Sequence, residues 1–149
     1  MRQLLSIFIS FFVIANTVIA GEGLVKVSSP YNVKTTADKL ETVLKAKGMT
    51  IFARIDHAMG AQKVGETLRP TELIIFGNPK VGTALMLCDQ DTGIDLPLKA
   101  LITEDEAGLI WLSYNHPQSL AKRYALKGCD AVLKKIEAAL GNFAKAATQ

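Results

Sequence analysis

The sequence predicts a single α+β domain whose curved, mainly antiparallel sheet of about five strands is backed by helices. Three observations predict this class. Segments rich in β-branched and aromatic residues alternate with helical patterns. Two of the strand segments are separated by a five-residue turn, as in a hairpin. The chain ends in a long stretch with an apolar stripe at helical spacing, which suits a helix packed on one sheet face.

The first elements are a strand and a helix. Residues 23–28 are expected to form a short strand. A helix over residues 37–47 follows, because Leu40 and Leu44 lie on one face of it. Thr35 or Thr36 can cap this helix, and Gly48 suits its C-terminal end.

The middle of the chain repeats this alternation. Residues 50–55 predict a second strand, after which Asp56 can cap a short helix over residues 58–65. Residues 72–76 predict a third strand. Pro79 fits the first turn of another short helix that continues to about residue 87.

The last part is a hairpin followed by helices. Residues 97–103 and 109–115 are the two strands, and residues 104–108 form the turn. The three acidic residues of this turn could suggest a metal site, but a solvated hairpin tip is the favoured interpretation. The tail over residues 117–144 is helical and is divided at Gly128.

Apolar residues occur on both faces of the predicted sheet. In the hairpin, one face carries Leu101, Leu109 and Trp111, and the other carries Ala100, Ile102, Ile110 and Leu112. Helices can cover one face, and large exposed apolar patches are unusual on monomers. A symmetric homodimer through the other face is therefore expected.

The first twenty residues have the pattern of a secretory signal peptide. Arg2 precedes an almost wholly apolar run over residues 4–19, and Val18-Ile19-Ala20 supplies the short residues of a cleavage site. A membrane anchor would need a longer run with flanking stop signals. We expect cleavage to leave residues 21–149 as one domain, soluble and either periplasmic or secreted, with no membrane contact afterwards.

Charge and cysteine content exclude some classes and leave others open. The formal charge is +3, and removing Arg2 with the signal leaves +2, which gives no basis for binding nucleic acid. Cys88 and Cys129 are candidates for a disulfide in an exported chain, and the alternative is two buried thiols. The sequence assigns no cofactor.

Three blocks resemble a known family. "FARIDHAMGA", "LRPTELIIFGNPKVGTALM" and "IDLPLKALITEDEAGLIWLSYNHP", followed by the helical tail, are similar to the bacterial family called domain of unknown function 302. The resemblance covers about residues 30–142. It implies an α+β fold with a curved antiparallel sheet backed by helices, like the saddle of the TATA-box-binding protein, and a tendency to dimerise. It implies no established reaction.

His57 is the candidate catalytic residue. Its unperturbed pKa lies near neutrality, so it can act as a general acid or base. Asp56 precedes it directly, but neighbouring strand residues point to opposite faces, so the two are not expected to form a dyad. The alternative for His57 is a hydrogen bond to a nearby backbone carbonyl.

The candidate ligand-binding residues come from two further segments. Asn78 and Lys80 lie where a strand gives way to a helix, and the start of a helix together with a lysine attracts anions. A tight turn is the simpler interpretation. Asp95, Lys99 and Tyr114 belong to the third block. Lys99 needs a partner if its sheet face is covered, either Asp95 or a ligand anion, with Ser113 as its expected cross-strand neighbour.

These observations favour an exported, dimeric domain that binds a small polar or anionic ligand. The pocket is expected at the ends of the strands over residues 50–55 and 72–76 and at the hairpin. The alternatives are a hydrolase- or isomerase-like enzyme that uses His57, a structural or interaction module, and a periplasmic copper or haem protein. The copper alternative depends on soft ligands, namely His57, Met59, Met86 and Cys88.

Overall fold

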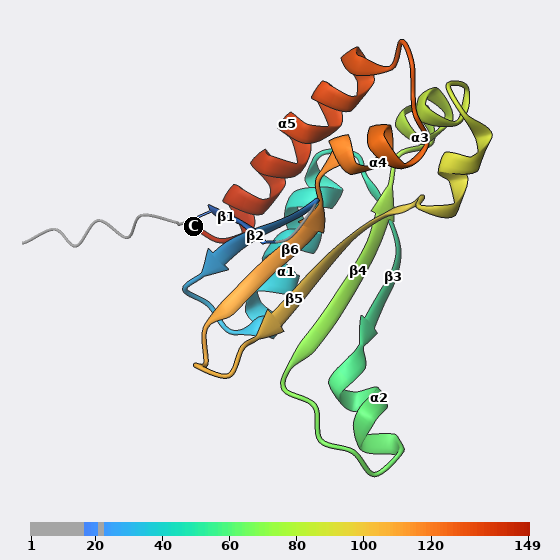
Figure 1. Ribbon diagram of the computed structural model, residues 1–149. Coiled ribbons are helices and arrows are strands. Elements are labelled where there is room, and N and C mark those ends of the chain that lie inside the picture. Colours follow the sequence, from blue (N-terminus) through green and yellow to red (C-terminus); the bar gives the residue numbers. More distant parts are fainter. Residues whose placement is uncertain (1–16, 21–22) are drawn as a thin grey trace, which may run out of the picture.

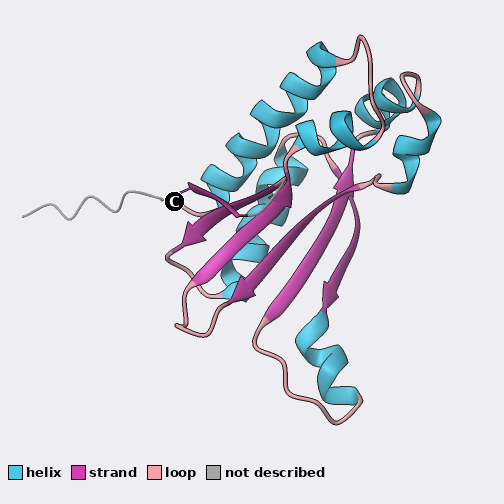
Figure 2. Cartoon of the chain, in the orientation of Figure 1, coloured by secondary structure: helices cyan, strands magenta, loops and turns pink. Residues whose placement is uncertain are grey.

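The computed structural model describes residues 17–20 and 23–149 and consists of one antiparallel sheet with helices on one face (Figures 1 and 2). The order of the strands in the sheet is β1-β2-β6-β5-β4-β3, and every neighbouring pair is antiparallel. The strands are β1 (Thr17–Ala20), β2 (Leu24–Ser29), β3 (Thr50–Asp56), β4 (Thr71–Gly77), β5 (Leu98–Glu104) and β6 (Ile110–Asn115). Strands β2 to β6 confirm the predicted five-stranded α+β architecture.

The α-helices of the described residues are α1 (Val33–Ala46), α2 (His57–Lys63), α3 (Pro79–Met86), α4 (Pro117–Arg123) and α5 (Asp130–Ala147). Helices α1 and α5 pack against each other and on the same sheet face, while α2 extends from one end of the sheet. A 3-10 helix, η1 (Gln90–Ile94), follows α3 and was not predicted. None of the helices in the described ranges combines the length and apolar character needed to cross a bilayer.

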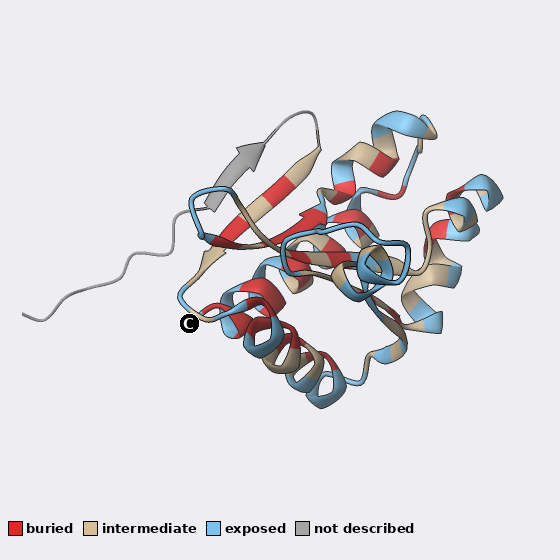
Figure 3. Ribbon diagram, turned by 90° about the horizontal axis from the view of Figure 1, so that it is seen from below, coloured by how far each residue is buried: buried red, intermediate tan, exposed pale blue. Residues whose placement is uncertain are grey.

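The core lies between the sheet and these two helices. Figure 3 shows that buried residues gather on the faces that the sheet and the helices turn toward each other. Alternation along each strand places one set of side chains on this face. The sheet contributes Ile74, Phe76, Ile102 and Leu112, and the helices contribute Leu40, Leu44, Leu133 and Ile136, all nearly inaccessible to solvent.

Helix α1 begins earlier than expected. The sequence suggested Thr35 or Thr36 as its cap, but Asn32 is the N-cap and its side chain accepts a hydrogen bond from the Thr35 amide. Thr36 is instead buried inside the helix, where its hydroxyl donates to the Asn32 carbonyl. The cap prediction was wrong because Thr and Asn are both good caps, and burial of Val33 fixes where the helix starts.

Other local predictions are confirmed. The Asp56 side chain caps α2 by accepting from the Met59 amide. Gly48 and Gly128 have φ values of 71° and 74°, so each ends or separates helices in the left-handed conformation that glycine adopts without strain. The acidic hairpin turn is a tip: the Asp105 carboxylate accepts from the Trp111 indole and from two backbone amides, and the indole contributes most to lowering its pKa.

The predicted signal peptide lies mostly outside the described residues. Its last four residues, Thr17–Ala20, form β1, which pairs with β2 at the edge of the sheet. Cleavage after Ala20 stays a prediction. If it occurs, it removes β1 and leaves β2 as the edge strand.

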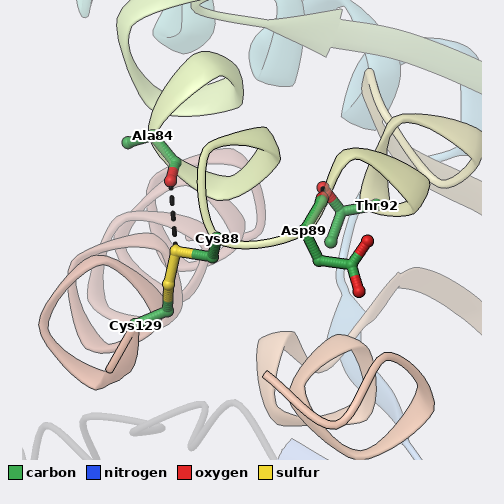
Figure 4. Close-up of a disulfide and its surroundings, with 5 residues drawn as sticks. All are labelled: Ala84, Cys88, Asp89, Thr92 and Cys129. Carbon is green, nitrogen blue, oxygen red and sulfur yellow. Dashed lines mark hydrogen bonds between the residues drawn. A yellow bond between two sulfur atoms is a disulfide. The ribbon is translucent and has the colours of Figure 1, made fainter. Parts of the chain in front are cut away.

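Cys88 and Cys129 form a disulfide, which joins the end of α3 to the start of α5 (Figure 4). Their Cα atoms are 6.5 Å apart, within the usual range for a bridge. Of the two interpretations left open by the sequence, the disulfide is the one that the structure contains. Next to it, Thr92 donates a hydrogen bond to the Asp89 carbonyl and fixes the turn into η1.

Candidate functional site

The expected pocket at the ends of β3 and β4 does not form, because these strands are antiparallel. Thr50 pairs with Gly77 and Asp56 pairs with Glu72, so the two C-terminal ends lie at opposite ends of the sheet. Figure 1 shows the consequence: α2, which begins with His57, and α3, which follows Asn78, are far apart. The structure therefore does not bring His57 together with Asn78 and Lys80.

His57 is exposed at the first position of α2. In the described part of the chain its imidazole has no hydrogen bond or ion pair, and Asp56 is occupied as the helix cap. Nothing in that range orients the ring or supplies a proton-transfer partner. A dedicated general base normally has such a partner.

Asn78 and Lys80 begin α3. The Asn78 side chain accepts a hydrogen bond from the Lys80 amide and donates one to the Gly48 carbonyl. The tight-turn interpretation is thus correct for Asn78, which also lines an apolar pocket. The Lys80 side chain is exposed beside it.

Asp95 and Lys99 meet, but not as a charge pair. The Lys99 ammonium donates to the backbone carbonyls of Asp95 and Pro97, at 3.4 and 3.3 Å. The Asp95 carboxylate instead accepts two hydrogen bonds from Arg123 and one from the Tyr124 hydroxyl.

The expected pairing of Lys99 with Ser113 is also wrong. Leu101 lies opposite Ser113, and Ala100 lies opposite Tyr114. Because β5 continues through Glu104 and β6 begins at Ile110, the turn is displaced by one residue and the register by two. Tyr114 shares a sheet face with its partner Ala100, so Lys99, the neighbour of Ala100, points to the opposite face and the two do not share a rim.

Tyr114, another predicted site residue, lines a cleft. Its ring is buried with 8% exposure and faces α5. Burial, and then the nearby Glu137 carboxylate, raise its pKa. The hydroxyl has no hydrogen bond in the described residues. Every fully buried polar side-chain atom of the described residues has a hydrogen-bond partner. The unpaired Tyr114 hydroxyl is therefore not fully buried and is accessible from the cleft.

The cleft lies between α5 and strands β2 and β6, and it has a volume of about 570 Å³. We call it the β6–α5 cleft. It is lined by Val25, Tyr114, His116, Lys134, Glu137, Ala138 and Gly141. Its four residues from α5 have the spacing of one helical face. Because Ala138 and Gly141 are small, they leave room beside the charged Lys134 and Glu137.

His116 and Glu137 make a polar pair in this cleft. The His116 Nδ1 atom accepts from the Gln118 amide, so the ring proton is on Nε2, which faces the Glu137 carboxylate at 3.4 Å. This arrangement can bind hydrogen-bonding groups or exchange a proton at Nε2. The position of His116 could have been noticed in the sequence, since it directly follows a strand and precedes a proline that starts a helix. Its partner is 21 residues away in α5, which only tertiary structure brings near.

The soft-metal alternative loses one of its ligands. Cys88 is bonded to Cys129 and so does not offer the thiolate that copper(I) prefers. Within residues 17–20 and 23–149, no group of three or more His, Cys, Asp or Glu side chains is arranged to hold a metal ion.

Comparisons with known proteins agree with the resemblance seen in the sequence. Residues 25–143 match the family model described as "Domain of unknown function DUF302". A crystal structure of an uncharacterized conserved DUF302 protein from Bacillus stearothermophilus matches the fold with a TM-score of 0.69 and 19% identity. That match covers 86% of this chain and 97% of the other.

Three curated relatives come from Brucella. The chain is 42% identical over 128 residues to proteins named "Fluoride-specific ion channel FluC 1" from Brucella suis and Brucella abortus, and to "Fluoride-specific ion channel FluC 2" from Brucella melitensis. These matches cover 85% of this chain but only 47% to 50% of the relatives, so the chain spans about half of their length. The match of the family model to most of the chain establishes that this protein belongs to the DUF302 family.

Proposed function

We propose that this protein is an exported binding protein for a small polar ligand that carries both a positive and a negative group, as a free amino acid does. The ligand would occupy the β6–α5 cleft. The observation that carries the proposal is the Tyr114 hydroxyl, which belongs to a buried ring yet has no hydrogen bond in the described residues. The disulfide and the signal-like N-terminus support export to an oxidising compartment.

The charges of the cleft favour a ligand with two opposite groups. Glu137 opposes a bare anion and Lys134 opposes a bare cation, while both line the same space. Lys134 and Glu137 are three residues apart on α5, so their side chains are neighbours. A carboxylate near Lys134 and an ammonium near Glu137 would match both, with the Tyr114 hydroxyl donating to the carboxylate.

The test is a binding titration with glycine, alanine, acetate and fluoride. Fluoride belongs in the panel because the Brucella relatives are named as fluoride channels. The amino acids are expected to bind. Tyr114→Phe is expected to weaken their binding about fivefold to tenfold, which corresponds to the loss of one hydrogen bond. Calorimetry measures this, with Tyr31→Phe, which lies outside the cleft, as the matched control.

A filling variant provides a second readout. A Cβ atom added at Gly141 meets no heavy atom within 4 Å, so Gly141→Leu should occupy the cleft without distorting α5 and should abolish binding. Gly60→Leu, in the exposed helix α2 and equally free of close neighbours, should bind normally. Undiminished binding in Tyr114→Phe and Gly141→Leu, or stronger binding of fluoride than of the amino acids, would contradict the proposal.

A homodimer through the open face of the sheet is part of the same proposal. The face turned away from α1 and α5 carries an apolar row across three strands, formed by Ile55, Leu73 and Leu101. Ile55 is 38% exposed, and the row runs across β3, β4 and β5, where a symmetric partner could pack its own row against it. Sedimentation at micromolar concentration should give a dimer, and Leu101→Glu a monomer. Val64→Glu, on an exposed side chain outside the sheet, is the control, and a monomeric wild-type protein would refute the interface.

A further inference from the structure

We propose a second binding site, independent of the β6–α5 cleft, that takes the hydrocarbon chain of an anionic amphiphile such as a medium-chain carboxylate. The site is a pocket of about 310 Å³ between α3, the segment from Gly93 to Leu98 and the start of α5. We call it the α3 pocket. Helix α3, which forms one wall, lies at the end of the sheet opposite to α2 (Figure 1).

The lining of the α3 pocket is almost wholly apolar. Its walls include Met49, Phe52, Met86, Leu96 and Ile136, and none of the described residues that line it is charged. Three glycines in the lining, Gly77, Gly82 and Gly93, keep the space open by having no side chain. A site of this composition has little to offer a polar ligand, because polar groups lose hydrogen bonds to water on entering it.

The pocket has room for a short chain. At roughly 30 Å³ for each water-sized group, about 310 Å³ holds about ten heavy atoms. The thioethers of Met49 and Met86 suit such a guest, because unbranched methionine side chains adapt to irregular apolar shapes.

Exposed apolar side chains occur in the pocket lining and directly after lining residues in the sequence. Phe52, in the lining, is 55% exposed, and Leu87 and Ile94, which follow the lining residues Met86 and Gly93, are 83% and 80% exposed. Phe52 lies at a bulge in β3 where the register with β4 shifts, which directs this ring to the pocket instead of into regular strand alternation. Exposed apolar groups in and next to the lining of an apolar pocket indicate a surface that binds apolar material.

The charge beside the opening selects the head group. Lys80 follows the pocket-lining residues Asn78 and Pro79, and in the described residues its side chain has no ion pair or hydrogen bond. The amides at the start of α3 already have acceptors, since Asn78 accepts from Lys80, Val81 and Gly82. A head group would therefore meet the Lys80 ammonium and not the helix amides, which favours a carboxylate.

The experiment measures binding of decanoate below its micelle concentration, with decanol and decyltrimethylammonium as probes of the same chain length. Decanoate should bind more tightly than decanol, and decyltrimethylammonium least. Gly82→Leu should weaken the binding of decanoate at least tenfold. A Cβ atom at position 82 meets only the tip of the Leu96 side chain, at 3.8 Å, so a longer side chain extends into the pocket. Gly60→Leu is the control for a leucine in an exposed helix.

Lys80→Met keeps the aliphatic stem and removes the charge. It should weaken the binding of decanoate about threefold to tenfold and leave the binding of decanol unchanged. Lys63→Met should change the binding of neither probe. Tyr114→Phe and Gly141→Leu should bind decanoate like the wild type, which keeps this site distinct from the cleft. The inference is overturned if Gly82→Leu, shown to be folded by circular dichroism, binds decanoate normally, or if the three probes bind the wild type equally.

Discussion

Replacing Cys88 with serine and Cys129 with alanine is expected to lower the free energy of unfolding by about 4 kcal/mol. The bridge joins residues separated by 41 positions, and closing a loop of that length removes about this much conformational free energy from the unfolded chain. Alanine suits position 129 because Cys129 is buried with 5% exposure, and a hydroxyl there would need a partner. Urea denaturation of the oxidised wild type and the double variant measures the difference.

Reduction of the wild type provides the matched comparison. Because it breaks the same bond without changing side-chain volume, reduced wild type should unfold at nearly the urea concentration of the double variant. The reductant should have no effect on the double variant itself. A difference below about 1 kcal/mol between oxidised and reduced wild type would show that the unfolded chain is not restrained by the bridge.

The same bond holds two walls of the α3 pocket in place. Met86 precedes Cys88 at the end of α3, and Ile136 follows Cys129 in the first turns of α5. Breaking the disulfide should therefore loosen the α3 pocket before it affects the β6–α5 cleft, because residues of α3 line the pocket whereas none of the residues that line the cleft comes from α3. In an exported protein the oxidised form is the one expected to function.

The elements of the fold were predictable because each depends on neighbouring residues. The runs at 50–55 and 72–76 are rich in β-branched and aromatic residues, so strands were expected where β3 and β4 are found. Helix starts failed where several capping residues lie together, as with Asn32, Thr35 and Thr36. The 3-10 helix after α3 was missed because Asp89 caps only a single short turn there.

The arrangement of the candidate sites was not predictable, because it depends on which strands are neighbours and in which direction they run. The sequence placed a polar residue after each of two strands, but the antiparallel β3–β4 register puts His57 and Asn78 at opposite ends. Tyr114 lines a cleft, but a different one from the expected pocket, and this cleft is completed by Glu137 and Lys134 from α5. No local pattern connects a strand end to a particular helical face 20 residues later.

Arg54→Met is expected to lower the free energy of unfolding by about 3 kcal/mol. Arg54 lies on β3, which among the described strands pairs with β4 alone. Its guanidinium forms ion pairs with Glu72 of β4 and with Asp38 and Glu41 of α1. The Glu72 hydrogen bond is the main cause that raises the Arg54 pKa above its ordinary value. Since the Glu72 side chain is only 13% exposed, removing its partner leaves a carboxylate in a poorly solvated place, which costs about 3 kcal/mol.

Two comparisons and an acid titration test this role. Arg69→Met removes an exposed arginine whose pair with Glu106 is 3.9 Å long, and it should cost less than about 0.5 kcal/mol. Arg54→Met combined with Glu72→Gln should recover much of the loss, because no unpaired carboxylate remains. Equal stabilities of the wild type and Arg54→Met in urea would show that Arg54 does not hold the edge strand.

The carboxylates of the network make the stability sensitive to acid. Lys34 and then Arg54 lower the pKa of Asp38 below its ordinary 3.8, and chiefly Lys45, with a smaller contribution from Arg54, lowers that of Glu41 below 4.5. Both groups bind protons more weakly in the folded state, so their stabilisation is complete above about pH 4.5 and is lost as the pH falls through the lowered values. In Arg54→Met this loss should shrink without vanishing, because Lys34 and Lys45 remain. Urea unfolding at pH 3 and pH 6 for both proteins measures the difference, and an unchanged acid sensitivity would mean that the lysines alone set these pKa values.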